Sequence, residues 1–111
     1  MRIRTVTFGL NIPAETYTAH TVHLAPGFTE WPGLIGKWWL GDNGSGRYGG
    51  VYLFASRHDA DSSRETELFR GMFTDPALKD VTVCEHDVLD VPSAITAPAL
   101  LAASAALQPP R

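Results

Sequence analysis

The alternation of apolar and polar positions near the start of the chain predicts a strand followed by a helix. The segment 3–8 is short and rich in β-branched residues, and Gly9 ends it, which is typical of a strand. Side chains suited to the buried face of a helix then recur at a spacing of three and four residues. These side chains are Ala14, Tyr17, Thr21, Leu24, Phe28 and Trp31.

The limits of this first helix follow from its capping and proline residues. Asn11 is a candidate N-cap, and Pro13 suits the first helical turn. Pro26 lacks a backbone donor and its ring collides with the preceding turn, so we expect the helix to kink or end near Ala25. From there the chain is expected to continue irregularly to Pro32.

Two aromatic-rich apolar runs, at 34–41 and 49–56, are separated by a glycine-rich turn and predict a β-hairpin. Trp38 and Trp39 are adjacent in the first run. Successive side chains of a strand point to opposite faces, so these two tryptophans must lie on different sides of the sheet. Both faces of the hairpin therefore carry large apolar groups.

A second helix and a fourth strand are predicted after the hairpin. Ser62 and Glu65 have the spacing of a capping box, and an apolar stripe follows them and ends before Asp75. His58 is an alternative, earlier start. The segment 81–91 holds several valines and is predicted as a strand. The residues of the apolar stripe are Leu68, Phe69, Met72 and Phe73.

The resulting order of elements, βαββαβ, predicts an α+β fold of the ferredoxin-like type. In that fold a four-stranded antiparallel sheet carries both helices on one face. We place this domain at residues 1–97 and expect the Ala-rich remainder, 98–111, to form either a short docking helix or a frayed tail. Because the hairpin is apolar on both faces, we expect a second copy of the chain to cover the far face.

Composition narrows the classes of function. The chain has 111 residues, which is one domain, and a net charge of -3 with nine basic residues scattered among twelve acidic ones. Without a basic stripe, nucleic-acid binding is not expected. The single cysteine, Cys84, cannot form an internal disulfide, and we find neither a signal peptide nor an apolar run long enough to span a membrane. We therefore expect a cytoplasmic protein.

Short motifs spread over residues 2–96 carry a family resemblance. They are Pro32-Gly33-Leu34, Lys37 with Trp39, Gly49-Gly50-Val51-Tyr52-Leu53-Phe54, Asp87-Val88 and Ser93. With these residues the chain resembles the YdhR-like monooxygenase family of the dimeric α/β-barrel superfamily. The resemblance implies a homodimer whose two sheets close into a barrel, with a ligand cavity between the sheet and the helices of each subunit. It also implies oxygenation of polyketide-like phenols without metal or flavin.

Two positions depart from the family pattern. Gly36 stands where family members often carry an aromatic residue, and His86 stands where they often carry phenylalanine. On a face that lines the cavity, Gly36 would enlarge the cavity and His86 would add an ionisable group.

Aromatic residues of the hairpin and the second helix are candidates for stacking on a flat hydrophobic ligand. Trp39 and Tyr52 are the stronger candidates because they carry polar atoms as well as large rings. The alternative is that the whole set is ordinary core. The full set is Trp39, Tyr52, Phe54, Phe69 and Phe73.

Three ionisable residues are candidates for catalysis. Lys37 lies in mid-strand among bulky apolar residues, where an amine binds an anion or loses its proton when buried. The alternative is an exposed lysine whose stem covers apolar surface. His20 flanks the apolar face of the first helix and is a candidate general base, or else a half-buried helix residue. His86 is a third candidate, with space filling as its alternative role.

The sequence predicts neither a metal site nor a cofactor, because His20, His23, Cys84 and His86 match no established ligand spacing. The leading hypothesis is a cofactor-independent monooxygenase acting on a flat phenolic or polyketide-like small molecule. One alternative keeps the pocket and replaces oxygen chemistry by isomerisation, cyclisation or decarboxylation. The other is a non-catalytic, dimeric small-molecule-binding protein, because fold analogy does not establish a reaction.

Overall fold

The computed structural model describes residues 1–107, the last four of them by their backbone alone. Its secondary structure begins as predicted, with a strand, a helix and a hairpin. Two short helices then replace the predicted second helix, and two further helices follow the last strand. In chain order the elements are β1 (Arg2–Leu10), α1 (Ala14–Phe28), β2 (Leu34–Asp42), β3 (Arg47–Phe54), α2 (Arg57–Ser63), α3 (Glu67–Gly71), β4 (Leu78–Asp87), α4 (Asp90–Thr96) and α5 (Pro98–Leu107).

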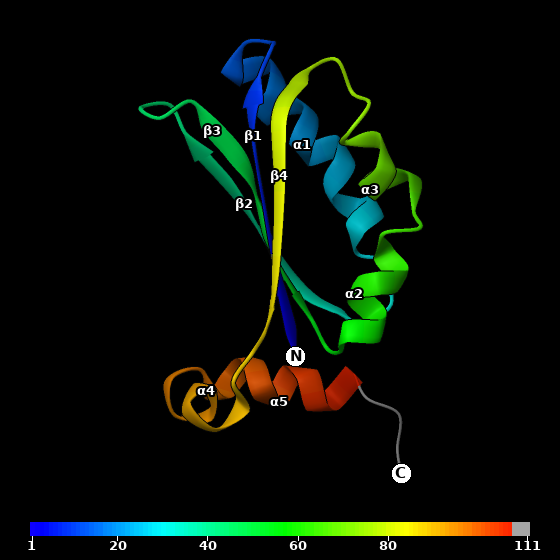
Figure 1. The fold of residues 1–111 in the computed structure, drawn as a ribbon, viewed down its shortest axis with the longest axis vertical. Helices are drawn as coiled ribbons and strands as arrows, with labels where there is room; N and C mark the ends of the chain where they lie inside the picture. Colours follow the sequence, from blue (N-terminus) through cyan, green and yellow to red (C-terminus); the bar gives the residue numbers. More distant parts are fainter. Residues whose placement is uncertain (108–111) are drawn as a thin grey trace.

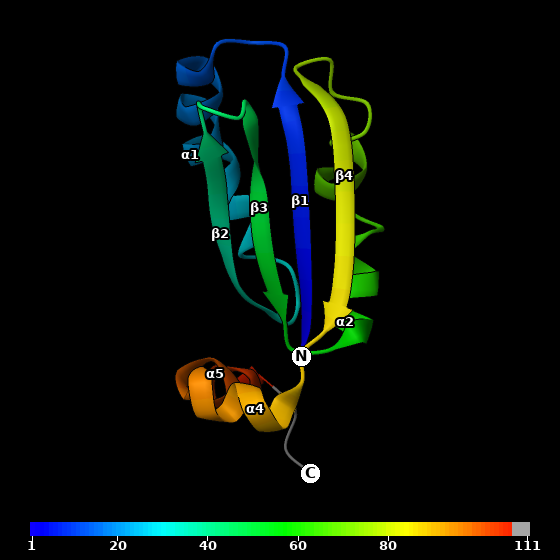
Figure 2. The same ribbon diagram turned by 60° about the vertical axis from the view of Figure 1, so that its left-hand side comes forward.

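The four strands form one sheet in the order β2-β3-β1-β4, and every neighbouring pair is antiparallel. Helices α1, α2 and α3 all lie on one face of this sheet (Figure 1). The opposite face is turned toward the viewer in Figure 2, and none of the helices within residues 1–107 lies over its strands. This arrangement confirms the predicted α+β, ferredoxin-like fold.

The core fills the space between the sheet and these helices. Strand alternation sends Arg4, Val6 and Phe8 of β1 toward the helices, and all three are buried. Trp38 and Trp39 take opposite faces as predicted: Trp39 packs against the core, whereas Trp38 is 49% exposed on the far face. The buried core cluster consists of Val6, Phe8, Phe28, Trp31, Tyr48, Tyr52, Phe54, Ala60 and Phe69.

Helix α1 differs from the prediction at both ends. It runs through Pro26 to Phe28, and its N-cap is Pro13. The helix continues for two residues beyond the proline, and the Thr29 hydroxyl closes its end by donating to the Pro26 carbonyl. Asn11 does not cap the helix; its side-chain amide donates instead to the carbonyl of Pro76 at 3.0 Å.

The predicted second helix is correct in its alternative start near His58, since α2 begins at Arg57, but it is wrong in its start at Ser62 and in its continuity. Ser56 caps α2 by accepting a hydrogen bond from the Asp59 backbone N–H, and Thr66 caps α3 by accepting one from Phe69. The capping box expected at Ser62 is not formed, because Ser62 lies inside α2. The near-helical turn that joins the two helices is closed by the hydrogen bond from the Thr66 hydroxyl to the Ser63 carbonyl.

Strand β4 begins and ends earlier than the predicted segment 81–91. It pairs with β1 from Leu78 to Asp87, and the chain then enters α4 at Asp90. The Ala-rich segment is helical as far as it is described: α5 lies across the lower end of the sheet in Figure 1 and contacts β2. The end of the predicted tail, 108–111, lies outside the described residues. Across residues 1–107, no helix is long and apolar enough to cross a membrane.

Candidate functional site

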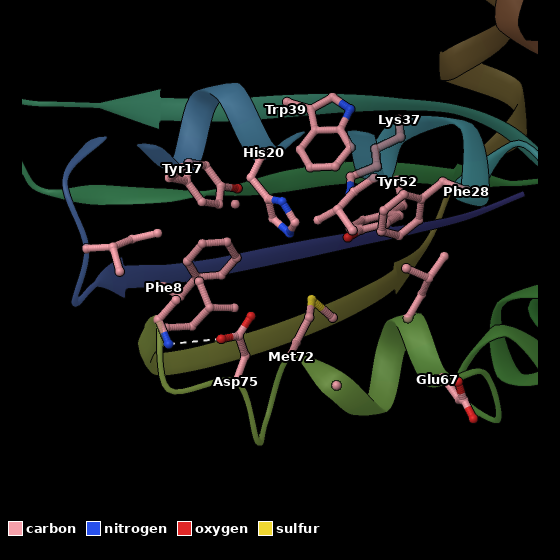
Figure 3. Close-up of a pocket in the computed structure, with 17 residues that line it drawn as sticks. Phe8, Tyr17, His20, Phe28, Lys37, Trp39, Tyr52, Glu67, Met72 and Asp75 are labelled. Atoms are coloured by element: carbon pink, nitrogen blue, oxygen red, sulfur yellow. Dashed lines mark hydrogen bonds between the residues drawn. The ribbon is translucent and has the colours of Figure 1, made fainter. Parts of the chain in front are cut away.

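A cavity of about 210 Å³ lies between the inner face of the sheet, α1 and α3. Its wall is mainly aromatic and aliphatic, with a few polar groups, which is the usual composition of a small-molecule site. Figure 3 shows side chains from the strands and from both helices converging on this space. The wall is formed by Phe8, Ile12, Tyr17, His20, Leu24, Phe28, Lys37, Trp39, Gly49, Tyr52, Glu67, Leu68, Gly71, Met72, Asp75, Ala77 and Leu78.

Lys37 is the basic side chain with the most unusual surroundings in this wall. In the β2–β3 register it lies opposite Tyr52, so both side chains point to the helices. Its Nζ lies 3.5 Å from the ring centre of Phe28, 3.4 Å from that of Trp39 and 4.6 Å from that of Tyr52. The amine is therefore held among three aromatic rings (Figure 3).

A glycine on the neighbouring strand makes room for the lysine stem. A Cβ added at Gly50 would lie 2.9 Å from Lys37 Cε, closer than such atoms approach. At the adjacent Gly49, φ is +149° and an added Cβ would lie 1.8 Å from the Val6 carbonyl oxygen, so this position also requires glycine. The glycine pair of the hairpin thus permits both the packing of β3 against β1 and the inward course of Lys37.

The electrostatics of the amine follow from burial without a counter-charge. Burial lowers the pKa of Lys37 to about 7, because the apolar cavity disfavours the ammonium form. The three ring faces attract the cation and limit this decrease. Among residues 1–103, whose side chains are described, none places a carboxylate within ion-pair distance of Lys37 Nζ. A substantial fraction of the amine is therefore neutral near pH 7.

The two tyrosines of the cavity remain protonated over the same range. Burial raises the pKa of Tyr17 to about 12 and raises that of Tyr52 further. The Tyr17 ring packs edge-on against Phe8 and Tyr48, with centroid distances of 5.7 and 5.5 Å. Their hydroxyls can donate hydrogen bonds to a ligand oxygen, whereas neither can serve as a base near neutral pH.

Four of the predicted site residues line the cavity together. They are Lys37 and Trp39 on β2, Tyr52 on β3 and His20 on α1. His20 has an exposed side chain, and in Figure 3 its ring extends from α1 over the cavity. The cavity thus joins a half-buried amine on the sheet side with an imidazole on the helix side.

The other predicted site residues lie outside this cavity. Phe54 has no exposed surface and stacks on Trp31 and Tyr52 in the core. Phe69 is buried beside Arg4, and Phe73 is 53% exposed with its ring against Phe69. His86 pairs with Ile3 in the register and is exposed on the far face of the sheet.

The sheet also keeps the candidate metal ligands apart. Cys84 and His86 lie on that face, while His20 lies on α1 across the sheet. No group of three or more His, Cys, Asp or Glu side chains within the described part of the chain could hold a metal ion.

Several lining residues were not predicted as functional. Tyr17, Leu24 and Phe28 belong to the apolar stripe of the predicted first helix. The sequence pattern located these residues on the buried face of the helix, but it did not show that they line a cavity. Phe28 matters most because it forms one side of the aromatic surroundings of Lys37. Gly50 was noted only as part of a motif, and its role depends on the course of a side chain on another strand.

Arg4 is a second cation close to the cavity residue Tyr52, and it has no exposed surface. Its guanidinium donates to Glu85 at 3.1 Å, to the Ser63 hydroxyl at 2.9 Å and to the Ala60 carbonyl at 2.8 Å. It also lies against the rings of Phe54 and Phe69. These hydrogen bonds connect β1 to both α2 and β4, and they leave the Arg4 guanidinium unavailable to a ligand.

Comparison with solved structures supports the fold assignment. A protein from Deinococcus radiodurans, described as a putative antibiotic biosynthesis monooxygenase, matches with a TM-score of 0.65 and 14% identity, over 82% of this chain and 95% of the other. SnoaB, a cofactor-independent oxygenase from Streptomyces nogalater, matches with a TM-score of 0.63 and 14% identity, over 82% and 97%. The heme-degrading protein MhuD from Mycobacterium tuberculosis, solved with two hemes in its active site, matches with a TM-score of 0.63 and 19% identity, over 82% and 99%. At these identities the likeness concerns the fold alone.

A comparison with curated proteins found no match. The comparison with family descriptions did: residues 3–99 match the family described as "Putative mono-oxygenase ydhR". The matched range runs from Ile3 in β1 through α4, and it contains the cavity and every residue of its wall. The chain therefore belongs to the YdhR mono-oxygenase family.

Proposed function

We propose that this protein is a cofactor-independent monooxygenase that oxidises a flat phenolic or polyketide-like molecule in the cavity beside Lys37. Family membership supports the reaction class, and the aromatic wall supports the ligand class. The observation that carries the proposal is the Lys37 amine, held among three rings with a pKa lowered to about 7.

In the proposed mechanism the neutral amine of Lys37 takes the proton of the substrate's hydroxyl or acidic carbon. A base with a pKa near the working pH is suited to this step, and the resulting ammonium then stabilises the substrate anion at close range. The Tyr52 and Tyr17 hydroxyls, which stay protonated, can donate hydrogen bonds to the same oxygen. His20 is a second candidate base at the helix side of the cavity.

The electron-rich anion then reacts with dioxygen. For an anthrone, one oxygen atom forms a bond to the ring carbon and becomes the new carbonyl oxygen, while the other leaves as water with the two hydrogens of that carbon. The substrate supplies all four electrons, so the reaction needs no external reductant. The protein contributes proton transfer, orientation and a cavity with little water.

A homodimer belongs to the same proposal. The far face of the sheet leaves Trp38 and Leu40 substantially exposed, which favours a partner that covers them. The cytoplasmic location expected from the sequence stays a prediction.

Oxygen uptake with anthrone as substrate, in the presence of a chelator, tests the proposed reaction. We expect uptake and anthraquinone formation in equal amounts, and a loss of at least about 100-fold in kcat/KM in Lys37→Met, because general-base catalysis contributes that much. Lys79→Met is the matched control, since Lys79 is the other lysine of the chain and lies exposed on β4. Full activity in Lys37→Met would overturn the role of the lysine.

Two other results would replace the proposed reaction. Product formation without oxygen consumption would indicate an isomerase, cyclase or decarboxylase. Thermal stabilisation by anthrone without any product would indicate a protein that only binds small molecules.

A further inference from the structure

We propose that Lys37 is also a carbonyl-reactive amine, which forms an imine with flat aromatic aldehydes or ketones that enter the cavity. This reactivity goes beyond the proposed oxygenation, because it uses the lysine as a nucleophile and needs no oxygen. The two properties can therefore succeed or fail separately.

The geometry gives the amine the surroundings that imine formation needs. Nζ projects among Phe28, Trp39 and Tyr52, and the same side chain forms part of the wall of the 210 Å³ cavity. No described carboxylate pairs with Nζ. A lysine desolvated in a hydrophobic pocket is a recognised form of activated nucleophile, because the neutral amine carries the reactive lone pair.

The cavity also determines which carbonyl compounds can react. Its wall is largely aromatic and aliphatic, so it favours a flat, apolar molecule over a small, strongly hydrated aldehyde. The protonated Tyr52 hydroxyl belongs to the same wall and can donate a hydrogen bond to a carbonyl oxygen. A ligand with an aromatic body and one carbonyl group therefore matches both features.

The covalent step balances without another reactant. The Nζ lone pair attacks the carbonyl carbon, a C–N bond forms, and the carbonyl electron pair moves to oxygen. Two protons from the amine then join that oxygen, which leaves as water when the C=N bond forms. Nothing is oxidised or reduced, and water reverses the reaction.

Reductive trapping tests the proposal directly. The wild-type protein is incubated without oxygen at pH 7.5 with 2-naphthaldehyde and sodium cyanoborohydride, which delivers hydride to an imine and leaves a stable secondary amine. Peptide mapping by mass spectrometry then compares the lysines, and the chain offers an internal control because Lys37 and Lys79 are its only two. We expect Lys37 to be labelled at least about tenfold faster than Lys79, because burial keeps much of the Lys37 amine neutral and the cavity holds the aldehyde beside it.

A positional variant separates a built site from mere amine reactivity. In Gly50→Ala the new Cβ would lie 2.9 Å from Lys37 Cε, so the stem must move while the lysine itself is kept. We expect labelling of Lys37 to fall by about tenfold in this variant, because reaction rates are sensitive to small displacements of the reacting group. Circular dichroism confirms that the variant is folded. If Gly50→Ala does not fold, competition by anthrone in the wild type replaces it, and we expect anthrone to slow labelling of Lys37 but not of Lys79.

The proposal fails if Lys37 and Lys79 are labelled at similar rates, or if Lys37 is not labelled. It also fails if anthrone does not slow the labelling of Lys37 at concentrations that saturate its binding. None of these readings depends on oxygen uptake, so trapping without uptake would contradict the oxygenase alone, and uptake without trapping would contradict the imine alone.

Discussion

Lys37 owes its surroundings to strand alternation and to a gap left by a neighbouring residue. Strand alternation places Lys37 and Trp39 on the inner face of β2, and it places Trp38, between them, on the outer face. The stem of Lys37 then passes the space that Gly50 leaves free. A charged lysine at this position lowers the free energy of unfolding, because its apolar surroundings disfavour the ammonium form.

The lowered pKa of Lys37 predicts that the free energy of unfolding depends on pH. The pKa of Lys37 is about 7 in the folded chain, against about 10.5 when unfolded, so between these values the unfolded chain binds more protons. The free energy of unfolding of the wild type therefore rises with pH relative to that of Lys37→Met, with a slope of at most about 1.4 kcal/mol per pH unit. Urea unfolding of both proteins between pH 6.5 and 9.5 measures the difference.

The upper limit of that range is chosen because of the tyrosines. The raised pKa values of Tyr17 and Tyr52 reduce stability only where unfolded tyrosine would ionise, near pH 10 and above. A difference between wild type and Lys37→Met that stays constant with pH would contradict a lowered pKa at Lys37.

The carboxylate of Glu85 lies between Arg4 and Arg64 and forms an ion pair with each. Burial would raise the pKa of Glu85, but the hydrogen bond from Arg64 and the charge and hydrogen bond of Arg4 outweigh burial and lower it. Glu85→Gln leaves Arg4, which has no exposed surface, without its counter-charge. We expect a loss of about 2–3 kcal/mol in the free energy of unfolding, measured in urea at pH 7.

Two comparisons make this prediction specific. Asp87→Asn is the matched control, because Asp87 pairs with Arg2 and Arg57 at the surface and its loss should cost far less. Because the pKa of Glu85 is lowered, its contribution is complete above about 4.5 and is lost as the pH falls through the folded value. The difference between wild type and Glu85→Gln should therefore shrink in acid.

Residue positions were predictable where they depend on alternation alone. Alternation places Arg4 on the same face as Val6, and Lys37 on the same face as Trp39, but it does not say which face turns inward. Their partners were not predictable, because Phe28 comes from α1 and Glu85 from β4. The burial of Phe54 likewise depends on Trp31, which follows α1 and stacks on its ring, and the exposure of Phe73 depends on where the chain leaves α3.

At the scale of elements, short helices depend strongly on their caps. Ser56 Oγ accepts from the Asp59 N–H at 3.1 Å and donates to the Asp59 carboxylate at 2.9 Å. We expect Ser56→Ala to lower the free energy of unfolding by about 1 kcal/mol, because α2 loses its N-cap. Ser62→Ala is the control: Ser62 is exposed inside α2, and we expect a change within about 0.5 kcal/mol. Equal effects in thermal unfolding would contradict the assignment of the cap.

Two helix boundaries were misplaced because they were predicted from local sequence patterns alone. Ser62 and Glu65 have the spacing of a capping box, but a cap also requires extended backbone at the first residue, and here Ser56 has it. Glu65 instead forms an ion pair with Arg70. Pro26 was expected to kink or end α1 near Ala25, yet the helix continues through it to Phe28. Local spacing thus predicts that an element exists better than it predicts where it ends.

At the scale of the whole molecule, the two faces of the sheet have different roles. The inner face holds the core and the cavity, while the outer face has no helix across its strands (Figure 2). The hairpin contributes apolar groups to this outer face, and β4 contributes more polar ones. By alternation and register the outer side chains include Ile3, Thr5, Trp38, Leu40, Val51, Thr82, Cys84 and His86.

We predict that two copies of the chain pair through their outer sheet faces. Trp38 is 49% exposed on the edge strand β2, and a large exposed aromatic residue on a sheet face is typical of an interface residue that contributes much of the binding energy. We expect the wild-type protein to sediment at twice the mass of the chain, and Trp38→Glu to raise the dissociation constant by at least about 30-fold, because the new carboxylate would be buried without a partner. Val22→Glu serves as the control, since Val22 is 71% exposed on α1, away from the outer face. A wild-type protein that sediments as a monomer at high concentration would contradict the dimer. The cavity would then belong to a single chain whose outer face remains in water, and Trp38→Glu would leave both the mass and the imine trapping unchanged.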